Sequence, residues 1–195
     1  MLQSKSKLIS GIYLAVDYHP NINFILNKIA KEFGIEPENG YDQSGNLREY
    51  KYHTTILYSK FKKPLPADSK LCNFQTKSGS TLFQIKKPKI SVPVKIIGFD
   101  FFDIKDKHNK PGINFHVRVD SPFLKSEFKR GISFGLPTDF PQYTPHITLS
   151  NTVSKEFRDS LKNASNPDYK KHKAIISKYI GTVLYTSDEY IEELD

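Results

Sequence analysis

Two short segments of the chain carry one pattern, in which a histidine and a threonine are separated by one residue and followed by an aliphatic residue. The segments are His53-Thr54-Thr55-Ile56-Leu57 and His146-Ile147-Thr148-Leu149-Ser150. Side chains alternate between the two faces of a β-strand, so the histidine and the threonine of each motif would project from one face. Two such strands side by side would surround a small space with two imidazoles and two hydroxyls. That group of side chains could perform acid–base chemistry on a phosphodiester without a metal ion.

The alternative for either motif alone is an ordinary strand segment. The histidine would then hydrogen-bond a neighbouring carbonyl, and the threonine would be present because β-branched residues suit strands. Two matched copies favour the functional interpretation, although short motifs also occur by chance.

Composition limits the class of protein. The chain has 195 residues, of which 37% are hydrophobic and 13% aromatic, and this indicates a folded globular protein with a substantial core. We expect no membrane span, because no apolar run approaches the ~20 residues that a span requires, and residues 1–17 do not resemble a signal peptide. A single cysteine, Cys72, excludes an intramolecular disulfide and a zinc site of several cysteines. These features predict a cytoplasmic protein, located in the host cell cytoplasm if the chain is viral.

The charge balance favours an anionic partner. The formal net charge is +8, from 29 Lys and Arg against 21 Asp and Glu. Basic residues cluster at 60–63, 86–89 and 170–173. Each cluster alone is typical of a solvated loop or helix face, but together they produce a positive field suited to phosphate-containing substrates.

The order of the expected elements places the motifs in two similar halves. An apolar strand at Leu8–Asp17 is followed by a helix that opens at Pro20 and ends at Gly34, with apolar residues at helical spacing. We expect a loop over 35–50, the first motif strand over 52–59 and a long connection over 60–82. Strands near 83–87, 90–98 and 100–104 are predicted to complete the first half. The second half is predicted to contain a strand over 113–119, a helix over 121–130 with Ser121 as N-cap, a loop over 131–145, the second motif strand, a helix over 154–163, strands near 174–180 and 181–185, and an acidic tail. Each half thus contains strand, helix and motif strand, and a pseudo-twofold arrangement would bring both motifs to one cleft.

The two motifs, with the strand Gly11-Ile12-Tyr13-Leu14-Ala15 ahead of them, resemble the two-histidine (2H) phosphoesterase superfamily over most of the chain. Within it, the chain is most similar to the bacteriophage anti-CBASS phosphodiesterases, which degrade the cyclic oligonucleotide signals of bacterial immunity. Further matching segments are His53–Ser59, Tyr143–Ser150 and Glu189–Leu194. The resemblance implies an α+β fold with a single bilobal domain over 1–195, in which two antiparallel-rich sheets form a central cleft with helices outside.

The residues and the resemblance together predict the roles in the site. His53 and His146 would act as general acid and general base, in either order, because imidazole titrates near neutral pH. Thr55 and Thr148 would donate hydrogen bonds to the non-bridging phosphate oxygens. No metal or other cofactor is expected. The resemblance further implies that Tyr13 holds a phosphate or a ribose and that Glu192 contacts a base, although an ordinary strand tyrosine and an exposed tail glutamate are the alternatives.

Other candidate residues are expected to have no catalytic role. His116 alternates correctly on a strand but lacks the threonine, so we interpret it as structural. His19, His108 and His172 are expected to face solvent, and Cys72 has no recognisable partner base. The related phosphodiesterases stack a tryptophan on a nucleobase, and this chain has no tryptophan. A tyrosine or phenylalanine would have to substitute, for example Phe140 or Tyr143.

Three functions therefore remain open. The first is a metal-independent phosphodiesterase that cleaves cyclic di- or trinucleotides. The second is a phosphodiesterase for 2′,3′-cyclic or 2′,5′-linked RNA, which the same four residues would serve. The third is a binding module without catalysis that retains RNA or cyclic nucleotides through its basic and aromatic residues. The expected partner is a cyclic oligonucleotide or a short RNA, and no membrane or obligate protein partner is indicated.

Overall fold

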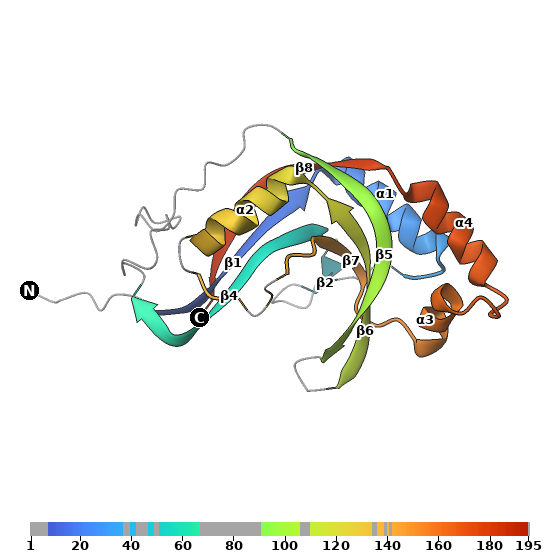
Figure 1. The fold of residues 1–195 in the computed structure, drawn as a ribbon, viewed down its shortest axis with the longest axis horizontal. Helices are drawn as coiled ribbons and strands as arrows, with labels where there is room; N and C mark the ends of the chain where they lie inside the picture. The colour runs from blue at the N-terminus through green and yellow to red at the C-terminus, as the bar shows by residue number, and fades with distance from the viewer. Residues whose placement is uncertain are drawn as a thin grey trace, which may run out of the picture.

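In the computed structural model of the chain, the described residues form a curved antiparallel sheet, a small two-stranded sheet and four helices (Figure 1). The structure describes residues 8–36, 40–41, 47–48, 51–66, 91–105, 110–133, 136–138, 140 and 142–194. The elements are β1 (Leu8–Tyr18), α1 (Pro20–Glu32), β2 (Gly40–Tyr41), β3 (Leu47–Arg48), β4 (His53–Pro66), β5 (Pro93–Lys105), β6 (Pro111–Asp120), α2 (Pro122–Ser133), β7 (His146–Ser150), α3 (Lys155–Lys162), α4 (Tyr169–Tyr179) and β8 (Val183–Leu194). The predicted α+β class is confirmed.

The six long strands form one sheet in the order β4-β1-β8-β5-β6-β7, and β2 pairs only with β3. This order is symmetric about its centre, because each motif strand lies at an edge beside the strand that precedes it in the chain by one long helix: β1 comes before α1 and β4, and β6 comes before α2 and β7. The long strand β8 joins the halves: its first residues pair with β5, as Leu184 does with Val94, and its later residues pair with β1, as Glu192 does with Tyr13. The strands of the two predicted sheets are therefore hydrogen-bonded into a single sheet in the structure.

The sheet curves so strongly that its two edges approach each other. Although β4 and β7 occupy opposite ends of the strand order, they lie in contact near the start of β4 (Figure 1). One face of each half is covered by helices (Figure 1), and the motif histidines His53 and His146 are the first residues of β4 and β7. The curvature is therefore what brings together two motifs that are far apart in sequence and in strand order.

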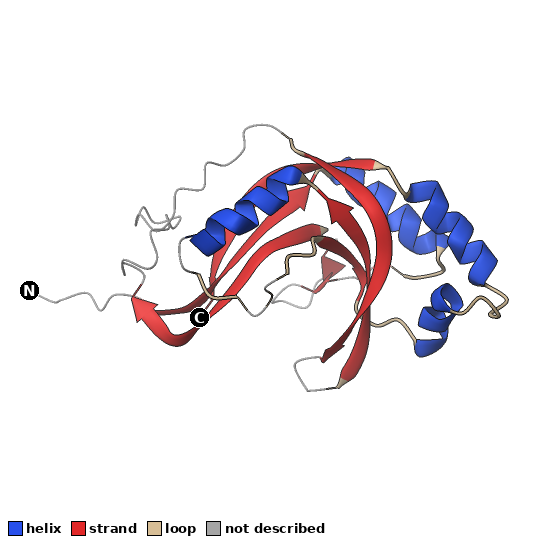
Figure 2. Cartoon of the chain, viewed as in Figure 1, coloured by secondary structure: helices blue, strands red, loops and turns tan. Residues whose placement is uncertain are grey.

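Three helices pack against the second half of the sheet. Helices α1, α3 and α4 gather at one end of the molecule, whereas α2 lies over β1, β4 and β8 (Figure 2). Phe33, directly after α1, is central to the aromatic core, with ring centroids 5.3 Å from Phe99 and 5.2 Å from Phe115. As predicted, α1 buries Ile22, Leu26 and Ile29, and Gly34 adopts a positive φ of 75° after its end.

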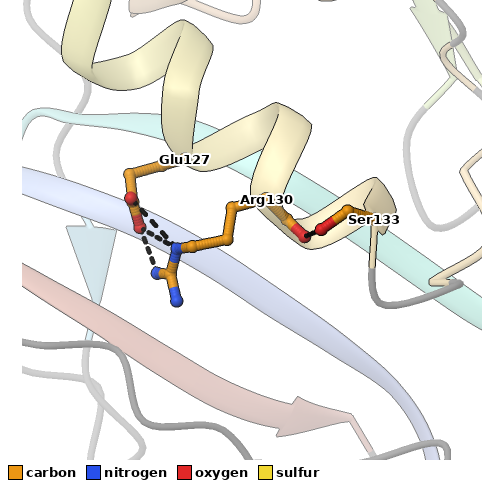
Figure 3. Close-up of polar contacts among 3 residues, drawn as sticks. All are labelled: Glu127, Arg130 and Ser133. Carbon is orange, nitrogen blue, oxygen red and sulfur yellow. Dashed lines mark hydrogen bonds and ion pairs between the residues drawn. The ribbon is translucent and has the colours of Figure 1, made fainter.

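Helix α2 carries a charged group on the side that faces β8. Arg130 forms an ion pair with Glu127 one turn earlier, with its Nε 3.1 Å from both carboxylate oxygens (Figure 3). Glu189 of β8 is buried next to this pair. Burial raises the pKa of Glu189 well above its usual range, and the neighbouring Glu127 raises it further.

Several predicted elements are wrong. Residues 174–180 are predicted to form a strand, but residues 174–179 belong to α4, which buries His172, Ile175 and Tyr179 at helical spacing. His172 is accordingly not exposed, and its Nδ1 lies 2.8 Å from the Ser160 hydroxyl on α3. The predicted break at Gly98 is instead an irregularity inside the continuous strand β5, and the acidic tail forms most of β8.

The helix caps and loops differ in part from expectation. Ser154 caps α3 as a side-chain acceptor for the Phe157 N–H, whereas the Ser121 hydroxyl donates to the Pro93 carbonyl. The predicted loop over 35–50 contains the two-residue strands β2 and β3. Strand β4 continues to Pro66, into the predicted long connection. The predicted strand at 83–87, the basic cluster at 86–89, His108 and Cys72 lie outside the described residues.

Candidate active site

The first motif lies at the start of β4 and contacts a tyrosine of β1. His53 and Thr55 are both half-buried, and Nδ1 of His53 lies 3.3 Å from the Lys51 carbonyl oxygen. Tyr13 lies on the neighbouring strand with its hydroxyl 3.0 Å from the Thr55 hydroxyl, and its ring meets the His53 ring edge-on at 6.1 Å. Ala15 and Asp17 of β1 lie opposite Thr55 and His53, so alternation along β1 places Tyr13 on the same face as the motif. The structure therefore groups three of the predicted site residues.

The second motif repeats this arrangement at the start of β7. His146 is half-buried, and its Nδ1 lies 2.9 Å from the carbonyl oxygen of Thr144, two residues earlier. The same relation holds in the first motif. A neutral histidine that donates from Nδ1 to a carbonyl carries its basic lone pair on Nε2, so the chain sets the same tautomer in both motifs.

A tyrosine links the two motifs across the meeting edges of the sheet. Tyr143, in the segment that leads into β7, donates its hydroxyl to the main-chain carbonyl of Thr55 at 3.2 Å. Its ring stacks on Phe128 of α2 with centroids 4.6 Å apart. Burial lowers the pKa of His146, the hydrogen bond to the Thr144 carbonyl opposes this change, and a positive charge on His53 lowers the pKa further. The two motif histidines are therefore coupled electrostatically.

His116, which we interpret from the sequence as structural, lies beside the second motif. It lies opposite Thr148 in the pairing of β6 with β7, is fully buried, and has its ring centroid 4.9 Å from that of His146. Burial lowers the pKa of His116 to about 3, with a further lowering by the charges of His146 and Arg118 and a partial opposition by Asp100. His116 is therefore a neutral imidazole at neutral pH.

Asn114 connects His116 to the second threonine. Its side-chain amide contacts the Thr148 hydroxyl at 3.1 Å and the Asn151 side-chain oxygen at 2.6 Å, and its side-chain oxygen lies 2.9 Å from Nδ1 of His116. Asn114 is buried in β6. Asn114 carries no motif in the sequence, and only the register between β6 and β7 places it beside the second motif.

Of the aromatic residues near the site, Phe102 lies closest to a motif histidine. Its side chain is 39% exposed, stacks on His116 at 4.1 Å and meets His146 edge-on at 4.9 Å. The predicted alternatives are arranged differently. Tyr143 is held by Phe128 and the Thr55 carbonyl, as described above, and Phe140 is 63% exposed in the segment before β7.

Glu192, the second predicted substrate contact, pairs through its main chain with Tyr13. It is thus located in β8 rather than in a tail, and β1 lies between β8 and the first motif strand. Arg118 is exposed and lies opposite His146 in the β6–β7 pairing. The described residues contain no group of three or more His, Cys, Asp or Glu side chains that could hold a metal ion. Within the same residues, no helix has the length and apolar character needed to cross a membrane.

Comparison with known proteins assigns the chain to a family. The family model of the anti-CBASS protein Acb1 matches residues 10–195. The chain is also 25% identical over 147 residues to an anti-CBASS protein Acb1 of Escherichia phage RB16. That alignment covers 75% of this chain and 66% of the relative, slightly less than two thirds of the relative's length. Because the family model spans nearly all of the chain, the chain belongs to the anti-CBASS protein Acb1 family.

Proposed function

We propose that the chain is a phosphodiesterase that opens cyclic di- or trinucleotides with the two motif histidines and without a metal ion. The observation that carries the proposal is the matched geometry of His53 and His146. Each begins an edge strand, and each directs Nδ1 to the carbonyl two residues earlier. This leaves Nε2 of each ring as the basic nitrogen for proton transfer. We further propose that the two halves of the sheet are the lobes of the 2H phosphoesterase fold.

The reaction starts with attack of a ribose 2′-OH on the adjacent phosphorus. His146 removes the proton of that hydroxyl, because its burial and the charge of His53 favour its neutral form. His53 donates a proton to the 5′-oxygen as the P–O5′ bond breaks. The product is an opened chain with a 2′,3′-cyclic phosphate, and a water molecule can open this ring when the two histidines exchange roles.

The threonine hydroxyls stabilise the charge that develops during this step. In the pentacoordinate transition state, negative charge grows on the non-bridging oxygens of the phosphate. Thr55 and Thr148 each present a hydroxyl near one histidine, and donors that are oriented before the reaction stabilise such charge most effectively. We expect Thr55→Val and Thr148→Val each to reduce kcat by about 10²-fold, because valine preserves the strand but removes the donor.

Substrate recognition is assigned to the residues around the motifs. We propose that Phe102 takes the place of the tryptophan found in related enzymes, since it is partly exposed beside His146. Tyr13 would hold a phosphate or ribose next to Thr55, and Glu192 would contact a base. Phe102→Ala should therefore raise KM more than it lowers kcat.

The family defines the biological setting that we propose. An anti-CBASS enzyme would act in the cytoplasm of an infected bacterium and remove a cyclic nucleotide signal of the host's immunity. The net charge of +8 would favour encounter with such an anionic substrate. No protein partner is required by this function.

One assay tests the proposal and its alternatives. The purified protein is incubated in EDTA with cyclic dinucleotides, cyclic trinucleotides, 2′,5′-oligoadenylate and linear RNA that ends in a 2′,3′-cyclic phosphate, and the products are separated by chromatography. We expect cleavage of a cyclic nucleotide and a loss of at least about 10²–10⁴-fold in His53→Ala and in His146→Ala. His19→Ala is the matched control, because His19 hydrogen-bonds Ser91 and has no role in the mechanism.

The possible outcomes separate the three functions. Cleavage of the RNA end but of no cyclic nucleotide would replace the proposal with an RNA phosphodiesterase. Tight binding without turnover would indicate a binding module. Near wild-type turnover in either motif variant would show that the two-histidine mechanism is wrong.

A further inference from the structure

A buried hydrogen-bonded chain runs from His116 through Asn114 to the hydroxyl of Thr148. The side-chain amide nitrogen of Asn114 lies 3.1 Å from the Thr148 hydroxyl oxygen, and its side-chain oxygen lies 2.9 Å from Nδ1 of His116. Both Asn114 and His116 are buried. Neither Asn114 nor His116 contains a group that the proposed reaction uses. These hydrogen bonds can therefore affect the reaction only through the hydroxyl of Thr148.

The orientation of the Asn114 side-chain amide decides whether Asn114 or Thr148 is the donor in the hydrogen bond between them. With the amide nitrogen toward Thr148, the same nitrogen also donates to the Asn151 side-chain oxygen at 2.6 Å. Reversing Asn114 alone would bring two oxygens together at that position. The reversed amide would also require a bare Nδ1 on His116 and hence a proton on its Nε2.

The surroundings of His116 favour the first orientation. Its Nε2 is buried and has no hydrogen-bond partner among the described residues. A buried acceptor without a partner is tolerated in proteins more often than a buried N–H without one. The proton of neutral His116 therefore belongs on Nδ1, where the Asn114 oxygen accepts it. This bond in turn fixes the amide nitrogen toward Thr148.

We propose that Asn114, oriented by His116, is a positioning residue that directs the hydroxyl proton of Thr148 toward the scissile phosphate. A threonine hydroxyl has one proton and two lone pairs, and Asn114 occupies a lone pair as a donor. The proton then has to point away from Asn114, toward the open side of the site. This inference rests on the proposed phosphodiesterase function, in which Thr148 donates to a phosphate oxygen.

The first half of the site uses a different group at the corresponding place. The Thr55 hydroxyl lies 3.0 Å from the Tyr13 hydroxyl, and either oxygen can be the donor in that pair. A side-chain amide nitrogen, in contrast, can only donate. The restriction on the hydroxyl proton is therefore specific to Thr148, and a variant at Asn114 should leave the contribution of Thr55 unchanged.

A double-mutant cycle tests whether Asn114 acts through Thr148. Asn114→Leu keeps the approximate shape and removes the donor, and it should lower kcat by about tenfold with little change in KM. In the Thr148→Val background the same substitution should lower kcat by less than about threefold, because no hydroxyl remains to orient. The full loss should persist in the Thr148→Ser and Thr55→Val backgrounds. Equal losses in all backgrounds would overturn the proposal, since a merely structural role of Asn114 would produce them.

A measurement on the wild-type protein tests the amide orientation without any substrate. Long-range ¹H–¹⁵N correlation spectra of histidine-labelled protein distinguish a protonated ring nitrogen from a bare one. We expect the proton of His116 on Nδ1 at pH 7, and a proton on Nε2 would overturn the inference. If the protein cleaves no substrate but His116 is protonated on Nδ1, the proposed function is refuted and the inferred orientation of Asn114 still holds. An active enzyme with Nε2 protonated would refute the inference alone.

Discussion

Mild acid should destabilise this protein partly through His116. The side chain is fully buried, and its burial lowers its pKa to about 3, against about 6.5 for an ordinary histidine. Between these values the unfolded chain binds a proton that the folded protein does not. Stability must therefore rise with pH in this window, and the contribution of His116 is lost as pH falls below 6.5.

The size of the effect follows from the two pKa values. At pH 5 the unfolded histidine is almost fully protonated and the folded one is not. The free energy of unfolding should then be lower than at pH 7.5 by about 2 kcal/mol from this residue alone. Other groups also contribute to the wild-type curve: the pKa of His146 and that of His172 are lowered by burial, whereas the pKa of Glu189 is raised. The informative quantity is therefore the difference between the wild type and a variant.

The assay is urea denaturation at pH 7.5 and at pH 5, applied to the wild type and to His116→Asn. Asparagine retains a donor for Asn114 but does not titrate, so the variant should lose about 2 kcal/mol less than the wild type between the two pH values. The control is His19→Asn, the same type of change at a half-buried histidine that contacts Ser91. If His116→Asn and the wild type lose the same stability within about 0.5 kcal/mol, His116 is not held in its neutral form.

Three further predictions concern activity and packing. Activity in EDTA should follow a bell-shaped pH profile, and its acidic limb in kcat/KM should lie below pH 6.5, because burial lowers the pKa of the proposed base His146; a limb above 6.5 would exclude that role. Glu189→Gln should gain stability relative to the wild type as pH rises from 5 to 8, by about 1–3 kcal/mol in urea denaturation, because the raised pKa of the buried carboxyl makes its ionisation costly when the protein is folded; an unchanged difference would refute this. Gly11→Ala should cost about 1–3 kcal/mol, since a Cβ there would collide with the Ser59 main-chain oxygen, whereas Gly98→Ala, which meets no atom within 4 Å, should cost less than about 0.5 kcal/mol in the same assay; similar losses in both would contradict the packing argument.

The parts of the fold that were predicted correctly have strong local signals. Helix α1 combines apolar residues at helical spacing with Pro20 at its start and Gly34 after its end, and the structure confirms both limits. The motif strands β4 and β7 were recognised from alternating, β-branched sequence. For these segments, the local preference and the tertiary environment agree.

The wrong predictions occurred where the tertiary environment decides the structure. A short apolar run such as Ala174-Ile175-Ile176 suits a strand or a buried helix equally, and here the packing of α4 on α3 selects the helix. The acidic end of the chain has little strand character in its sequence. It forms β8 because its main chain hydrogen-bonds to both β1 and β5 at the centre of the sheet.

Residues of the site could be predicted only where they share a motif. His53, Thr55, His146 and Thr148 follow from the repeated pattern, and their catalytic roles stay predictions. Asn114 and Phe102 have no such pattern, since they reach the site through the pairing of β6 with β5 and β7. Register between strands is not encoded in a single segment, so no inspection of these residues alone could have placed them there.

The strand order is symmetric, but the surroundings of the two histidines are not, and this difference can assign the proton roles. His146 lies against the buried His116 ring and the Phe102 ring, so a positive charge on His146 is poorly solvated and its neutral form is favoured. His53 has a tyrosine hydroxyl and a threonine hydroxyl nearby instead. A duplicated motif therefore need not produce two interchangeable catalysts. The proposed reaction requires a neutral base and a protonated acid at the same pH. An environment that differs between the two halves therefore favours one histidine as the base and the other as the acid.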